Sequence, residues 1–201
     1  MKIPSKILLL GALAFSMTQH ADAISVSLAP SGQNIGVGGH AILNIVISGL
    51  TPGSAPAIGA FDFELSYDSS LLSASSVSFG SGLDLGINLS SQFFDLTTPG
   101  VILVSELSFE SAADLIASSQ GSFTLATLDL IGLSLGTSPV SFTLVDLSDQ
   151  DGMSLIDVSS MGAEVTVSGG STAVADASNS LCGLLTSLAG LALACRLGGK
   201  L

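Results

Sequence analysis

Residues 59–72 read GAFDFELSYDSSLL. Over the first nine positions apolar and polar side chains alternate. Successive side chains of a β-strand point to opposite faces, so this alternation predicts a strand with one buried face and one solvated face. The buried face is expected to carry Phe61, Phe63, Leu65 and Tyr67, and the solvated face Asp62, Glu64 and Ser66.

The same period of two recurs through the middle of the chain. Further strands are expected at 24–28, 41–48, 77–79, 101–109, 123–133, 140–147 and 164–167, separated by turn residues such as Pro-Gly and Asp-Gly. A helical period is limited to residues 112–119. Many short strands at regular spacing predict an all-β fold, a single antiparallel β sandwich of jelly-roll topology with about nine strands.

The N-terminal segment has the pattern of a secretory signal peptide over residues 1–23. Two lysines precede an apolar stretch that is too short to span a bilayer, and Ala21 and Ala23 form a small-x-small cleavage site. The chain is therefore expected to be exported, with the mature protein beginning near Ile24.

The C-terminal segment predicts a membrane anchor. Residues 169–180 have the composition of a flexible linker, and residues 181–201 hold an apolar run followed by Arg196 and Lys200. This arrangement resembles the PEP-CTERM sorting tail of exported bacterial proteins, with its short motif matched by Val174, Ala175 and Asp176, where alanine replaces the usual proline. The resemblance implies a transient anchor that an exosortase-like enzyme removes; the alternative is a permanent anchor.

The charges are distributed unevenly between the ends and the middle. The chain has 16 acidic and 4 basic residues, and all four basic residues lie near its ends. Residues 24–168 hold 14 of the carboxylates and neither Lys nor Arg, which excludes nucleic-acid binding by this part. Both cysteines lie in the tail, so the middle must be stabilised by its core rather than by disulfides.

Residues 24–168 resemble a cohesin domain. The stretch 59–72 is similar to the cohesin signature G-x-x-x-F-x-x-x-YD-x-x-x-L, residues 121–128 (GSFTLATL) are similar to a later strand, and 136–139 and 149–152 resemble closing turns. The resemblance implies a nine-stranded jelly-roll sandwich that binds another protein, such as a dockerin, with a partner contact at Asp62. From the residues alone, Tyr67 ends the strand and Asp68 bonds the backbone of the following turn.

The partner-binding residues are expected to be Asp62, Glu64 and Ser66. With no basic residue nearby, these side chains remain available to a basic or hydroxyl-rich partner, or to one bridged by divalent cations. The alternative function is a carbohydrate-binding module acting on extracellular polysaccharide. The chain has no Trp to stack on a sugar, so Phe93 and Phe94 are the aromatic candidates, with one ring expected to face outward.

Catalytic residues are scarce in the middle of the chain. His40 is the only histidine between residues 24 and 168, no cysteine accompanies it, and zinc ligands are lacking. We therefore expect a non-enzymatic cell-surface or matrix protein without a cofactor, calcium excepted. The acidic residues around 149–152 fail the EF-hand spacing, yet they could gather one calcium ion; the candidate ligands are Asp146, Asp149, Asp151 and Asp157. The other acidic positions are expected on solvated strand faces and turns.

Overall fold

The computed structural model describes residues 23–86 and 90–169, which form eleven strands and one short helix. In chain order the elements are β1 (Ser25–Ala29), β2 (Gly32–Gly36), β3 (His40–Ser48), β4 (Ile58–Ser66), β5 (Leu72–Phe79), β6 (Ser90–Asp95), β7 (Val101–Ser108), α1 (Ala112–Ser118), β8 (Ser122–Gly132), β9 (Gly136–Asp149), β10 (Ser159–Met161) and β11 (Ala163–Ser168).

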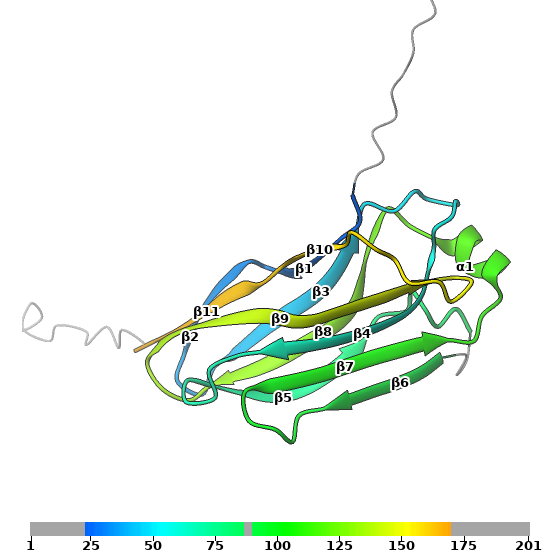
Figure 1. The fold of residues 1–201 in the computed structure, drawn as a ribbon. Helices are drawn as coiled ribbons and strands as arrows, with labels where there is room; N and C mark the ends of the chain where they lie inside the picture. The colour runs from blue at the N-terminus through cyan, green and yellow to red at the C-terminus, as the bar shows by residue number, and fades with distance from the viewer. Residues whose placement is uncertain (1–22, 87–89, 170–201) are drawn as a thin grey trace, which may run out of the picture.

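The strands form two sheets that face each other across one core (Figure 1). The first sheet has the order β10-β1-β3-β8-β5, and the second has the order β2-β11-β9-β4-β7-β6. Apolar side chains from both sheets fill the space between them, among them the fully buried Leu43, Phe63 and Leu128. The predicted all-β sandwich is confirmed.

Strand β4 lies near the middle of the second sheet, and its alternation is the one expected from sequence. Phe61, Phe63 and Leu65 are buried, while Asp62 is exposed. The rings of Phe61 and Phe63 stack with centroids 4.9 Å apart, which places two large apolar groups side by side in the core. Gly59 lets β9 approach closely, because a Cβ there would lie 2.4 Å from the Asp149 carbonyl oxygen.

The Tyr67-Asp68 pair ends β4 as the sequence predicts. The half-buried Tyr67 hydroxyl accepts a hydrogen bond from the Ala74 amide at 3.2 Å. The Asp68 carboxylate accepts the Ser70 amide at 2.9 Å and the Ser70 hydroxyl at 2.6 Å. These two hydrogen bonds lower the pKa of Asp68 and fix the turn that leads into β5.

Strand number and direction differ from the sequence-based prediction of about nine antiparallel strands. In the described part there are eleven, and two pairs are parallel: β1 with β10 and β2 with β11. Both pairs join segments far apart in the chain, and a parallel pair requires such a long connection. The short strands β2, β6 and β10 lie at sheet edges and carry little periodic signal, so the sequence did not predict them.

Helix α1 confirms the helical period predicted at 112–119. It spans Ala112–Ser118, and the hydroxyl of its N-cap residue Ser111 accepts a hydrogen bond from the Asp114 amide. Within residues 23–86 and 90–169, no helix is both long and apolar enough to cross a membrane. Most of the predicted signal peptide and the sorting tail, including Ala21, Val174, Ala175 and Asp176, lie outside the described residues; Ala23 is the first described residue and is exposed.

Candidate functional site

The outward side of β9, β4, β7 and β6 brings the predicted partner-binding strand together with three neighbours. We call this surface the acidic face. In register across it, Asp62 of β4 lies opposite Asp146 of β9 on one side and Ser105 of β7 on the other, and Ser105 lies opposite Phe93 of β6. The four side chains therefore form one row across the sheet.

Asp62 and Asp146 are two carboxylates placed directly opposite each other on antiparallel strands. Side chains in this position have Cβ atoms about 5 Å apart, and like charges there destabilise a sheet. In the described ranges no hydrogen bond or ion pair involves either carboxylate, and those ranges contain no Lys or Arg. The row thus presents uncompensated negative charge to solvent.

The other two predicted site residues are less available than Asp62. The Glu64 carboxylate is half-buried and accepts a hydrogen bond from the Thr143 hydroxyl of β9 at 2.8 Å. Ser66 is half-buried at the end of β4, opposite Val101 and Ser141. All three predicted residues thus lie on the outward side of β4, but only Asp62 is both exposed and without a partner in the described part.

Exposed apolar side chains lie within this row and beside it. Phe93 is 56% exposed, Leu107 49% and Leu144 47%. A shallow hollow of about 310 Å³ is lined by the four residues of the row and by Leu107, among others. Exposed apolar groups beside unpaired charges are typical of a protein-binding surface.

Both rings of the Phe93-Phe94 pair are exposed, although the sequence predicted only one outward ring. The two rings lie on opposite sides of β6: Phe93 opposite the outward Ser105, and Phe94 opposite the buried Val104. Phe94 remains 46% exposed because β6 is the last strand of its sheet, where the core ends.

Glu106 corrects the prediction that the remaining carboxylates are solvated. Its side chain is only 2% exposed and points to the inner side of β7. One oxygen, Oε1, accepts a hydrogen bond from the Gln92 amide at 2.9 Å, whereas Oε2 has no partner among the described atoms. Burial raises the pKa of Glu106, and the nearby Asp84 adds to this effect. The sequence contained a signal for this burial. Glu106 lies two and four positions after Val104 and Ile102, so all three side chains point to the same side of β7.

The four candidate calcium ligands do not form one metal-binding group in the described part of the chain. Among the described residues no group of three or more His, Cys, Asp or Glu side chains could hold a metal ion. Asp146 lies on the acidic face beside Asp62. The Asp149 carboxylate accepts the amides of Asp151 and Met153, both at 2.9 Å, so it stabilises its own turn. Asp157 is a separate exposed residue in the loop before β10.

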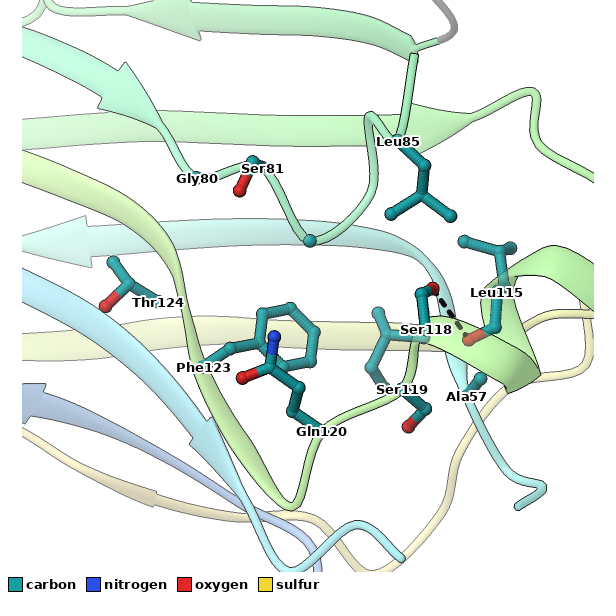
Figure 2. A pocket seen from close by; sticks show the side chains of 12 residues that line it. Ala57, Gly80, Ser81, Leu85, Leu115, Ser118, Ser119, Gln120, Phe123 and Thr124 are labelled. Carbon is teal, nitrogen blue, oxygen red and sulfur yellow. Dashed lines mark hydrogen bonds between the residues drawn. The ribbon is translucent and has the colours of Figure 1, made fainter. Parts of the chain in front are cut away.

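His40 and the end pocket offer no catalytic arrangement. His40 is exposed at the start of β3, and its Nδ1 pairs with the Asp129 carboxylate of β8 at 2.9 Å, with no nucleophile in the pair. The pocket of about 400 Å³ beside α1, shown in Figure 2, is lined by apolar and neutral polar residues such as Leu115, Gln120 and Phe123. None of its lining side chains is a carboxylate, imidazole or thiol that could transfer a proton or attack a substrate.

Solved structures similar to this one come from cohesins. A cohesin from Clostridium acetobutylicum has a TM-score of 0.60 and 20% identity, covering 74% of this chain and 93% of that one. The fold is that of a cohesin domain. A non-cellulosomal cohesin from the archaeon Archaeoglobus fulgidus has a TM-score of 0.56 and 16% identity, covering 75% of this chain and 95% of the archaeal chain.

Several of the similar cohesins were solved in complex with a dockerin. A type I cohesin–dockerin complex from Clostridium thermocellum has a TM-score of 0.59 and 15% identity, covering 75% of this chain and 97% of that one. No protein-family model matches the sequence, and no curated protein matches it. At these identities the likeness establishes the cohesin fold.

Proposed function

We propose that this protein is a non-catalytic binding protein whose acidic face holds a protein partner. The observation that carries the proposal is the Asp62–Asp146 pair, two like charges side by side on a sheet without a neutralising cation. A partner that supplies positive charge would relieve the repulsion between these two carboxylates, so the pair favours binding of a cationic surface here.

The chemistry of the face favours a partner that donates hydrogen bonds and buries apolar surface. Exposed Lys, Arg, Ser or Thr side chains would pair with Asp62 and Asp146, and apolar side chains would pack on Phe93, Leu107 and Leu144. Dockerins bound to the similar cohesins support a dockerin-like partner. A partner bridged by divalent cations is a variant of the same proposal.

The place of action that we propose is the cell surface or the extracellular matrix. It is supported by the signal-peptide pattern of residues 1–23 and by the linker and apolar tail of residues 169–180 and 181–201. The binding domain would then be residues 24–168. The tail would hold it at the membrane, transiently if Val174-Ala175-Asp176 is processed and permanently if not.

One observation favours polysaccharide as a second candidate ligand. Phe93 is exposed on the acidic face beside the hydroxyl-bearing Ser91 and Ser105, and an aromatic face next to polar groups can stack on a sugar ring. Against this, only one ring of the Phe93-Phe94 pair lies on the acidic face, which gives a small stacking surface, and the adjacent carboxylates favour a cationic ligand.

A pull-down from the secreted fraction of the parent organism tests the proposal. The chain is used as bait beside two variants: Asp62→Ala on the acidic face, and Thr127→Ala on the outward side of the other sheet as the control. A protein captured by the parent chain and by the Thr127 variant, but not by the Asp62 variant, would support the proposal. Capture that is equal for all three baits would contradict it, and binding on a glycan array alone would favour polysaccharide.

A further inference from the structure

Two turns at the end of the sandwich where β11 ends form an exposed apolar tip. The tip consists of Val37, in the turn between β2 and β3, and of Leu133 and Leu135, between β8 and β9; the three side chains are 58%, 46% and 63% exposed. Hydrogen bonds join the two turns, from the Gly38 amide to the Gly132 carbonyl at 2.7 Å and from the Gly132 amide to the Gly39 carbonyl at 3.0 Å. The apolar side chains therefore stand on one connected surface.

Charged side chains flank the tip: Asp68 lies in the turn before β5, and the paired His40 and Asp129 follow the Val37 turn on the first sheet. No residue in segments 35–39 and 132–137 is charged. The Leu133 amide bonds the Leu71 carbonyl at 2.8 Å, which joins the tip to the turn that holds the exposed Asp68. The Asp68 carboxylate makes the neighbouring part of this end acidic. A partner for the tip must consequently accept apolar side chains without carrying negative charge.

The described chain also ends at this tip. Gly169 follows β11, and a Cβ at Gly169 would lie 3.9 Å from Leu135 Cδ2. Figure 1 shows that β11 ends at the opposite end of the sandwich from the start of β1, so Ala23, just before β1, lies far from the tip. Only residues 170–180 separate Gly169 from the apolar run that begins at Leu181, and a chain of that length spans at most about 40 Å.

We propose that the apolar tip rests on the surface of a zwitterionic lipid bilayer when the tail is anchored there. This rests on the proposed anchoring of residues 181–201. A short connection keeps the tip near the membrane that holds the run, and apolar side chains on exposed turns enter the interfacial region of a bilayer. The carboxylate of Asp68 disfavours an anionic lipid surface. The acidic face, on the side of the sandwich, would stay open to its partner.

Fluorescence on vesicles tests the tip directly, because the chain has no Trp. In a chain from Ala23 to Leu201, Leu135→Trp places a probe at the tip, and Ile156→Trp places a matched probe in the loop before β10, where the side chain is 83% exposed. With Cys195→Ser, Cys182 is the only thiol and can be coupled to a maleimide lipid in phosphatidylcholine vesicles. This tether holds the chain at the membrane whether or not the apolar run inserts.

The expected result is quenching by brominated phosphatidylcholine that is at least twofold stronger for Leu135→Trp than for Ile156→Trp. Adding Val37→Ser and Leu133→Ser should reduce the quenching of the tip probe to the level of the control. Equal quenching of the two probes would overturn the proposal. So would a tip probe already blue-shifted without vesicles, since the chain's own apolar run would then cover the tip. If the chain that is not coupled to lipid fails to bind vesicles, this result overturns the proposed membrane anchoring of residues 181–201 but not the proposal for the apolar tip.

Discussion

The outward sides of the two sheets differ in how their polar groups are satisfied. On the first sheet, side chains pair across strands: Ser25 with Ser48 at 2.9 Å, Thr127 with Asn44 at 2.7 Å and His40 with Asp129 at 2.9 Å. On the acidic face the central row sets two carboxylates side by side, and in the described part of the chain neither has a partner.

We interpret this difference as one between a surface that stabilises its sheet and the surface that we propose for binding. Cross-strand pairs such as Thr127–Asn44 add stability to the sheet that carries them. Uncompensated like charges bordered by exposed Phe and Leu side chains lower stability and leave hydrogen-bonding capacity unused. Substitutions on the first sheet should therefore change stability alone, whereas substitutions on the acidic face should change binding.

The largest effect is expected from Asp62→Ala. Loss of the exposed carboxylate should weaken binding to a captured protein partner by about 1–3 kcal/mol if the contact is desolvated. Titration calorimetry with the parent chain and the variant measures this, with melting curves to show that the fold is unchanged. Equal affinities would mean that the partner binds elsewhere.

Thr127→Val should lower the free energy of unfolding by about 1–2 kcal/mol, because it leaves the half-buried Asn44 Oδ1 without its donor. Urea unfolding measures the change, and Ser78→Ala on the same outward side, at an exposed position of β5, is the control. Partner affinity should stay within twofold. A loss of affinity in the Thr127 variant would assign binding to the first sheet.

Glu106→Gln should raise the free energy of unfolding at pH 7 by about 1 kcal/mol. Burial raises the pKa of Glu106 in the folded state. Keeping this side chain ionised in the core therefore lowers the free energy of unfolding at pH values above that pKa, and the loss shrinks as the pH falls and the side chain becomes protonated. The variant has no such loss at any pH. The difference between variant and parent should consequently disappear near pH 4, where the unfolded side chain is also protonated. A difference that is constant with pH would contradict this account.

Asp146→Asn should give the smallest change in stability, an increase of about 0.2–1 kcal/mol, because it removes the like charge opposite Asp62. Its effect should shrink in high salt, which screens exposed charges. Denaturant unfolding at low and high ionic strength measures both. A decrease in stability at low salt would show that the two carboxylates do not repel each other.

Features encoded by local periodicity could be predicted from the sequence. Alternation over residues 61–67 fixed the inward side of β4 and with it the outward position of Asp62. The Asp68 turn could be predicted because an aspartate bonds amides two residues ahead in the chain. Both depend on neighbours within a few positions.

Features that depend on long-range pairing could not be predicted. The sequence does not state that β9 lies beside β4, so the Asp62–Asp146 row was not foreseen, and Asp146 was assigned to a calcium site instead. Glu106 was predicted to be solvated because it is charged, although the alternation along β7 places its side chain on the inner side. The parallel strands β2 and β10 are short, and their partners lie more than 120 residues away in the chain.

The central claim is that the protein partner binds the acidic face. Covering the outward side of each sheet in turn tests this claim most directly. In a chain with Cys182→Ser and Cys195→Ser, Ser105→Cys places one thiol in the acidic row and Ser78→Cys places one on the outward side of the first sheet. Each is coupled to a bulky maleimide, and affinity for the captured partner is measured before and after coupling. We predict that the label at position 105 weakens binding at least 100-fold and that the label at position 78 leaves it unchanged. Full binding with position 105 labelled, or loss only with position 78 labelled, would contradict the account.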